Sequence, residues 1–170
     1  QLQSSMKRPQ GATVFAYHVA EPERYGVVEF DSQWQPMRLV EKPKEFVSHY
    51  AVTGLYFYDE SAPKRAASIR PSARGELEIT ALNELYLNDG QLHVEVLGRG
   101  AAWLDTGTPD SMLEASNFVE AVERRQGLLV SSPEEIGYRQ GWISSAQFLA
   151  LAEAYGSSEY GLQLRRVVTR

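Results

Sequence analysis

The sequence predicts an α/β protein in which a mixed β-sheet is followed by a group of helices. Segments rich in β-branched and aromatic residues recur through the first hundred residues and are interleaved with stretches of helical periodicity. From Pro109 onward the apolar residues recur at helical spacing. The chain has 170 residues and no internal repeat, and a chain of this length can bury a core of its own.

Four segments near the beginning of the chain are predicted to be strands. Residues 12–19 carry the β-branched and aromatic side chains typical of a strand. Residues 25–30 and 37–42 are joined by the polar loop 31–36 and should pair as an antiparallel hairpin. Residues 51–58 are apolar on both faces, which predicts a central strand.

Two helices and one further strand complete the predicted sheet region. Asp59 is expected to open a helix that ends at about Ile69. Residues 76–87 have apolar side chains at helical spacing and stop before Gly90, and residues 92–97 return to strand alternation. Residues 1–11 are interpreted as a connector that enters the first strand.

The last part of the chain is predicted to be helical. Thr108 is a suitable N-cap and Pro109 a suitable first-turn residue, while Gly127 predicts the end of that helix. Three shorter helices are expected at residues 133–140, 144–155 and 159–168.

Composition excludes several classes of protein. The net charge of -5 and the dispersed basic residues argue against a nucleic-acid partner and against an anionic membrane surface. No apolar run approaches the roughly 20 residues of a membrane span. The absence of Cys excludes disulfides and zinc–thiolate sites and is compatible with a reducing cytoplasm. The three histidines lie too far apart to form a His-x-x-x-His ligand pair.

Asp105 is the first candidate for chemistry. Residues 101–104 are expected to form a short buried strand, so Asp105 would lie between that strand and the helix that begins at Pro109. Ligands of open α/β sheets collect beyond the carboxyl ends of strands, and a carboxylate there suits a hard cation. The alternative is that Asp105 only caps a turn.

Glu41-Lys42-Pro43 is the second candidate, because an acid can accept sugar hydroxyls and an ammonium can bind phosphate. Successive strand residues face opposite sides, so the two side chains can converge only if the strand ends or bulges there. Pro43 cannot continue the ladder and makes such an end plausible. The alternative is a solvated charge pair.

Arg74 and Gly26 are weaker candidates. Arg74 is predicted to lie just before a helix N-terminus, where a guanidinium and backbone amides suit phosphate, although the nearby glutamates could simply complement the helix dipole. Gly26 could let a ligand approach the backbone, or could serve the turn. The chain contains neither a Walker loop nor a complete dinucleotide fingerprint.

Together these segments resemble the sugar nucleotidyltransferases, and among them the glucose-1-phosphate thymidylyltransferases. The resemblance covers nearly the whole chain, with the same order and spacing. It is carried by Glu-Arg-Tyr-Gly-Val-Val-Glu-Phe at 23–30, Glu-Lys-Pro at 41–43, Tyr-Ala-Val-Thr-Gly-Leu-Tyr-Phe-Tyr-Asp at 50–59, Arg-Gly-Glu-Leu-Glu-Ile-Thr at 74–80, Trp-Leu-Asp-Thr-Gly-Thr at 103–108 and Pro-Glu-Glu-Ile at 133–136.

This resemblance implies the C-terminal portion of a three-layer α/β/α nucleotide-diphospho-sugar transferase fold. Residues 1–127 would form the sugar-phosphate side of that domain, and residues 128–170 a C-terminal helical region. The implied reaction makes dTDP-glucose and pyrophosphate from dTTP and glucose 1-phosphate with Mg²⁺. The implied setting is a cytoplasmic homotetramer that serves dTDP-rhamnose and polysaccharide biosynthesis.

The resemblance also assigns roles to residues. The catalytic residues would be Lys42, Arg74 and Asp105. Asp105 would be one of two metal-binding aspartates, and Lys42 and Arg74 would contact the sugar phosphate. The sugar itself would lie among Tyr25, Gly26, Glu41, Val52 and Tyr56, and a regulatory nucleotide site would include Glu135, Ile136 and Arg139.

One departure from the family limits what this chain is expected to do alone. The glycine-rich Gly-x-Gly-Thr-Arg loop, the base-recognition region and the second metal aspartate are missing from the sequence. The isolated chain is therefore expected to be inactive until the N-terminal half is supplied. The alternative function is a non-catalytic sugar-phosphate binding or regulatory module.

Overall fold

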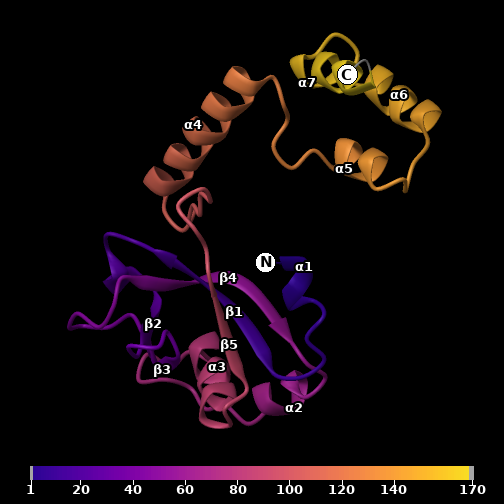
Figure 1. Cartoon of the computed structure of the whole chain (residues 1–170). Helices are drawn as coiled ribbons and strands as arrows, with labels where there is room; N and C mark the ends of the chain where they lie inside the picture. Colours follow the sequence, from indigo (N-terminus) through magenta and orange to yellow (C-terminus); the bar gives the residue numbers. More distant parts are fainter. Residues whose placement is uncertain (1, 169–170) are drawn as a thin grey trace. The chain divides into compact units, whose positions relative to one another are not determined.

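A computed structural model describes residues 2–168 and divides the chain into two compact units, Gln1–Trp103 and Leu104–Arg170 (Figure 1). The first unit contains the sheet and the second is helical. The division predicted from the sequence, between the sugar-phosphate side at residues 1–127 and a helical region at residues 128–170, stays a prediction.

The first unit is built on a mixed five-stranded sheet, as the sequence predicts. The order across the sheet is β3-β2-β4-β1-β5. β1 pairs in parallel with β5 and antiparallel with β4, and β2 and β3 form the predicted antiparallel hairpin. β4 lies in the middle, as expected of a strand apolar on both faces. The strands are β1 Ala12–His18, β2 Gly26–Phe30, β3 Pro36–Glu41, β4 Tyr50–Tyr58 and β5 Leu92–Val96.

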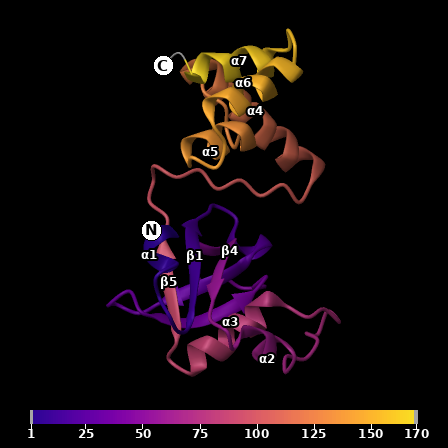
Figure 2. The ribbon, with the colours of Figure 1, turned by 90° about the vertical axis from the view of Figure 1, so that its right-hand side faces the viewer.

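The main core lies between one face of this sheet and helix α3, Ile79–Asn88 (Figure 2). Because side chains alternate along a strand, every second residue of β1 points to the helix, and Val14 and Ala16 are fully buried there. Leu82 and Tyr86 of α3 pack into the same cluster. The first turn of α3 is thereby held close to β3.

The predicted strand at residues 101–104 is wrong. A strand needs a neighbour to satisfy its backbone groups, and this segment turns instead: the Ala101 amide donates to the Gly98 carbonyl at 2.9 Å. The Ala101 carbonyl accepts a hydrogen bond from the Tyr17 hydroxyl at 3.1 Å. The segment is therefore a loop that is hydrogen-bonded to the end of β1.

Two helices have other bounds than predicted, and one short helix is not predicted. The helix expected at residues 59–69 is only α2, Ala62–Ala66, because the Asp59 carboxylate accepts hydrogen bonds from the amides of Gly11 and Ser61 and fixes a turn there. α3 begins at Ile79 rather than at residue 76, since a loop precedes it. The expected connector at the start contains a short helix, α1, Leu2–Ser5, and a single 3₁₀ turn, η1, covers Pro22–Arg24.

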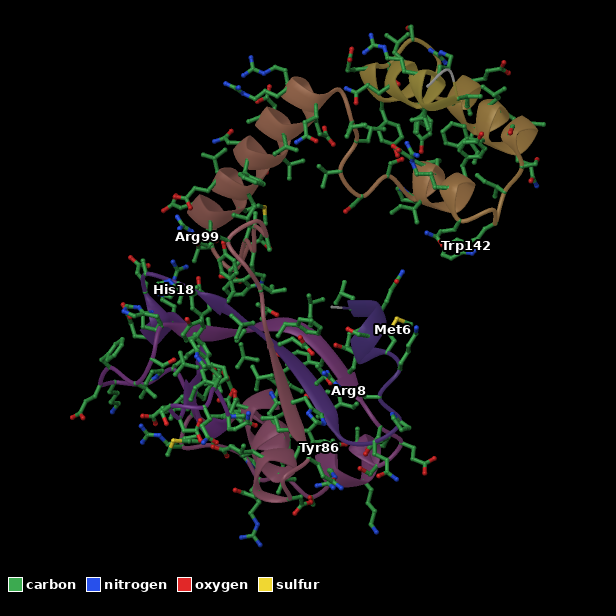
Figure 3. All side chains as sticks on the ribbon, in the orientation of Figure 1. Met6, Arg8, His18, Tyr86, Arg99 and Trp142 are labelled. Atoms are coloured by element: carbon green, nitrogen blue, oxygen red, sulfur yellow. The ribbon has the colours of Figure 1, made fainter. Side chains whose placement is uncertain are left out.

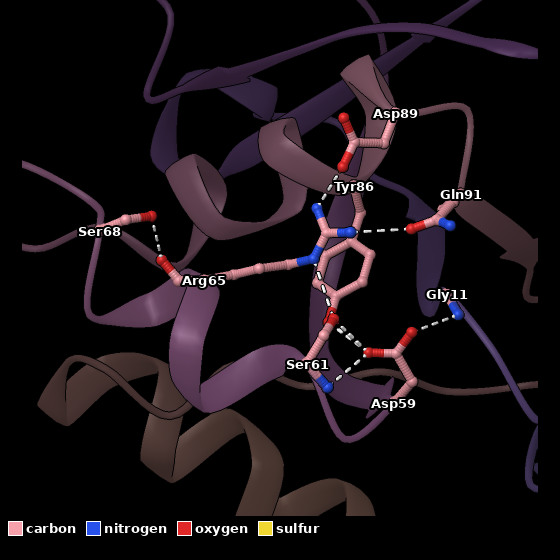
Figure 4. A network of polar contacts seen from close by, with 8 residues as sticks. All are labelled: Gly11, Asp59, Ser61, Arg65, Ser68, Tyr86, Asp89 and Gln91. Carbon is pink, nitrogen blue, oxygen red and sulfur yellow. Dashed lines mark hydrogen bonds and ion pairs between the residues drawn. The ribbon is translucent and has the colours of Figure 1, made fainter.

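A polar network joins α2, the end of α3 and the start of β1 (Figure 4). Arg65 donates to Asp89 at 2.5 Å and to Gln91 at 2.8 Å, and its guanidinium lies 4.2 Å from the centre of the Tyr86 ring. The Tyr86 hydroxyl donates to Asp59 at 2.9 Å. Hydrogen bonds from the Ser61 hydroxyl and the Gly11 amide hold the pKa of Asp59 well below its usual range.

The second unit contains the four helices that the sequence predicts. α4 begins at Pro109 after a Thr108 cap and ends at Gly127, whose φ of 63° lies in the left-handed region. The other helices form a small core around Phe148 and Leu164. None of the described helices is both long and apolar enough to cross a membrane. The helices are α4 Pro109–Gln126, α5 Pro133–Arg139, α6 Ser145–Ala154 and α7 Glu159–Val168.

Candidate functional site

The β2–β3 hairpin and the first turn of α3 bring three residues together. Gly26 and Glu41 are site residues that the sequence predicts, and Thr80 is not. Strand pairing places Gly26 directly opposite Glu41. The buried Thr80 hydroxyl donates to Oε2 of Glu41 at 2.6 Å. A Cβ atom at Gly26 would lie 2.9 Å from both of these oxygens. Gly26 therefore leaves room for the Glu41 and Thr80 side chains, and the close approach of its backbone to a ligand stays a prediction.

Arg74 lies beside the same carboxylate. Its Nη1 atom is 3.7 Å from Oε1 of Glu41 and 3.6 Å from Oε1 of Glu78, and its Nη2 atom is 2.6 Å from Glu76. The prediction that Arg74 lies at a helix N-terminus is wrong, because α3 begins only at Ile79. The ion pairs nevertheless hold an exposed guanidinium at the edge of the cluster, where an incoming phosphate could replace a carboxylate partner.

Lys42 follows the last residue of β3 and has a φ of 42°, in the left-handed region. Its amide donates to the Tyr25 carbonyl at 3.0 Å. The strand ends at Glu41, so regular alternation no longer forces Lys42 to face away from it. A non-glycine residue in this region costs about 1–3 kcal/mol and is most often found at functional sites.

The remaining predicted sugar-binding residues, Tyr25, Val52 and Tyr56, also belong to the first unit. Tyr56 is half-buried and stacks on Tyr58 at 5.9 Å. Burial, and then the charge of Glu41, raise the pKa of Tyr56 above its usual value. Val52 packs against the core, and the Tyr25 ring meets Trp103 at 5.1 Å. The structure therefore brings Glu41, Gly26 and Arg74 together, and Tyr56 lies near enough for the charge of Glu41 to act on it.

Asp105 belongs to the second unit, in the loop that precedes α4. Its carboxylate is half-buried, and a Cβ atom at Gly107 would lie 3.2 Å from its Oδ2 atom, so glycine leaves room beside it. Within residues 2–168 no group of three or more His, Asp or Glu side chains is arranged to hold a metal. A single carboxylate of this kind can serve as one ligand of a divalent cation that takes its other ligands from phosphates and water.

The predicted regulatory residues share one short helix. Glu135, Ile136 and Arg139 all lie on α5, and Arg139 donates to Glu135 at 2.7 Å across one helical turn. Ile136 is exposed. A regulatory role of these three residues stays a prediction.

Sequence reasoning missed Thr80. Leu82 and Tyr86, two of the apolar residues at helical spacing in this segment, are buried, but the third, Ile79, is 42% exposed. The buried face also carries Thr80 and Asn83. The available signal in the sequence is a threonine between the apolar residues Ile79 and Ala81. Only the position of the hairpin in the structure shows that the Thr80 hydroxyl contacts Glu41.

A comparison with models of protein families defines the class to which this chain belongs. The chain belongs to the nucleotidyl transferase family, whose model matches residues 1–122.

Within that family the relatives are named more narrowly. The glucose-1-phosphate thymidylyltransferase of Xanthomonas campestris pv. campestris is 53% identical over 169 residues, which are 99% of this chain and 57% of the relative. That of Mycobacterium tuberculosis is 52% identical over an alignment of 172 positions, which covers 99% of this chain and 60% of the relative. This chain thus spans less than two thirds of the length of these relatives.

A solved structure supports the predicted fold. A Bacillus anthracis protein described as a glucose-1-phosphate thymidylyltransferase, crystallised with sucrose, is 38% identical and superposes with a TM-score of 0.61. The match covers 69% of this chain and 46% of the other. The prediction of an α/β nucleotidyltransferase fold is confirmed.

Proposed function

We propose that this chain forms the sugar-phosphate side of a glucose-1-phosphate thymidylyltransferase, an enzyme that makes dTDP-glucose and pyrophosphate from dTTP and glucose 1-phosphate. The observation that supports this most strongly is the convergence of Gly26, Glu41, Thr80 and Arg74. An oriented carboxylate beside a guanidinium is the pair of groups that a phosphorylated sugar requires.

Each group has a distinct task in this proposal. Thr80 occupies one oxygen of Glu41 and fixes its orientation, which leaves the other to accept a sugar hydroxyl. Arg74 would exchange carboxylate partners for the phosphate, and Lys42 would add a second positive charge. Gly26 offers backbone without a side chain, and Tyr25, Val52 and Tyr56 would line the sugar.

The transfer needs charge neutralisation and in-line alignment more than a protein nucleophile. When bound, Mg²⁺ supplies that neutralisation of the phosphates. Asp105 would hold it as one carboxylate ligand. The work of the remaining residues is to hold the sugar phosphate so that its oxygen meets the nucleotide in line.

Other properties implied by the family belong to the same proposal. They are a cytoplasmic homotetramer and a regulatory nucleotide site that includes Glu135, Ile136 and Arg139. The exposed Ile136 and the neighbouring Arg139 offer an apolar surface and a cation for such a ligand.

A second candidate function is a sugar-phosphate binding or regulatory module without transfer. It would use the same carboxylate, guanidinium and glycine, at Glu41, Arg74 and Gly26. Both candidates use the cluster around Glu41, so binding alone does not separate them.

Assays of dTDP-glucose formation separate the two candidates. The chain is tested alone, and also fused behind the part of the Xanthomonas campestris relative that it does not cover. We expect turnover from the fusion with dTTP, glucose 1-phosphate and Mg²⁺, and none from the chain alone. A folded fusion that binds glucose 1-phosphate but forms no product would support the binding module instead.

A further inference from the structure

A group of aromatic side chains lies at the turn of the β2–β3 hairpin, apart from the cluster around Glu41. The rings of Phe30, Trp34 and Tyr50 form a mutually packed group, with centroids 5.4 to 5.5 Å apart. We call these three residues the aromatic platform. Trp34 remains 57% exposed although two rings support it. The platform therefore presents a held indole to solvent.

The backbone at Trp34 would suit glycine better. Its φ of 60° lies in the left-handed region, which bulky side chains rarely adopt. The turn itself is closed by backbone groups, because the Trp34 amide donates to the Asp31 carbonyl at 3.1 Å and the Asp31 amide donates to Gln35 at 3.0 Å. The indole is not needed to make the turn, so its presence despite the strain points to a role in binding.

A cavity of about 470 Å³ adjoins the platform, within the size range of small-molecule sites. Two carboxylates line it in fixed orientations. Glu29 accepts from Arg38 at 3.0 Å, and Oδ1 of Asp31 accepts from the amides of Gln33 and Gln35 at 2.8 and 2.9 Å. His18, at the end of β1 (Figure 3), lines the same cavity together with His49, Ser48 and Ser32.

We propose that this cavity binds an uncharged saccharide of one or two rings, stacked on Trp34. An exposed aromatic face can cover the apolar face of a sugar ring, and oriented carboxylates can accept hydrogen bonds from the sugar hydroxyls. Glu29 is paired with Arg38, but the Asp31 carboxylate accepts from backbone amides and keeps its negative charge, which would repel a phosphate and argues against a nucleotide or a sugar phosphate. The cavity thus differs in chemistry from the cluster around Glu41, where Arg74 supplies positive charge.

The test follows indole N–H signals of ¹⁵N-labelled protein during titration with maltose. The chain contains three tryptophans, and Trp34→Gly identifies one signal by its loss. This variant should fold, because glycine adopts the required φ freely. Trp142→Gly is a matched control, since Trp142 is 75% exposed but lies in the second unit. Thymidine serves as a second ligand with a stacking ring.

We expect maltose to shift the Trp34 signal and leave the Trp142 signal unchanged. Trp34→Gly should weaken maltose binding by about tenfold or more. Amide shifts of residues near Tyr50 measure this binding in the variant. Glu41→Gln should leave that binding intact, so its outcome is independent of whether the proposed transferase function holds. No shift with maltose up to tens of millimolar, or a shift with thymidine instead, would overturn the saccharide proposal.

Discussion

Gly26 shows how a single missing side chain can define a site. A Cβ atom at Gly26 would lie 2.9 Å from two oxygens, Oε2 of Glu41 and the Thr80 hydroxyl. Both oxygens belong to side chains that can move. A side chain at position 26 would therefore be accommodated at the expense of the Glu41–Thr80 hydrogen bond.

The corresponding variant is Gly26→Ala. We expect glucose 1-phosphate binding to fall by about tenfold or more, while overpacking lowers the free energy of unfolding by about 1–3 kcal/mol. Gly54→Ala is the matched control, because a Cβ atom there would meet nothing within 4 Å. Calorimetry and chemical denaturation of both variants provide the measurements. Normal sugar-phosphate binding by Gly26→Ala would remove this glycine from the site.

Lys42 can be tested through the charge of the ligand. Lys42→Ala should weaken binding of glucose 1-phosphate by about tenfold, because an ammonium–phosphate hydrogen bond is lost, and should change glucose binding little. Lys44→Ala provides an exposed neighbour of the same type as a control. Equal losses for glucose and glucose 1-phosphate in calorimetric titrations would indicate a packing role.

Residue type was enough to suggest part of this site from the sequence. Glu41 and Arg74 were candidates because an acid and a guanidinium bind sugars and phosphates. Thr80 could not be found in that way, because its role depends on a contact between α3 and β3 across 39 residues. Similarly, the left-handed backbone of Lys42 is not visible in the sequence.

At the scale of elements, the network around Asp59 joins segments that are distant in the chain. Its carboxylate accepts from Gly11, Ser61 and Tyr86. Because these hydrogen bonds lower the pKa of Asp59, they stabilise the folded state when Asp59 is ionised. That contribution is complete above the unfolded pKa of about 3.9 and is lost as the pH falls through the lower folded value.

Asp59→Asn should therefore lower the thermal midpoint at pH 7, and its difference from the unaltered chain should shrink below about pH 4. Glu60→Gln, next to it and exposed, is the control. Thermal unfolding of the three proteins between pH 7 and pH 3 gives the comparison. A difference that stays constant across this range would show that ionisation of Asp59 is not the stabilising factor.

Most elements were predictable because their signals are local. The helix α4 has a capping threonine, a first-turn proline and a terminal glycine, and its predicted bounds are confirmed. The predictions at residues 59–69 and 101–104 failed where tertiary hydrogen bonds, at Asp59 and at Ala101, set the backbone instead. Local propensity does not contain those contacts.

At the scale of the whole molecule, the chain consists of a sheet unit with the cluster around Glu41 and a helical unit that contains Asp105. Positioning of both reactants can contribute on the order of 7 to 11 kcal/mol to catalysis. The fusion described above, with Asp105→Asn, should lose transfer while it keeps its fold, because an amide is a poorer Mg²⁺ ligand than a carboxylate. Near-normal turnover at saturating Mg²⁺ would contradict the metal role.

The central claim is that the cluster of Gly26, Glu41, Thr80 and Arg74 binds a sugar phosphate, and calorimetric titration of the chain with glucose 1-phosphate tests it most directly. We predict measurable binding that Glu41→Gln weakens for both glucose 1-phosphate and glucose. Arg74→Ala should weaken binding of glucose 1-phosphate far more than that of glucose. Binding that neither substitution changes would contradict the claim, as would the absence of binding by a chain shown to be folded.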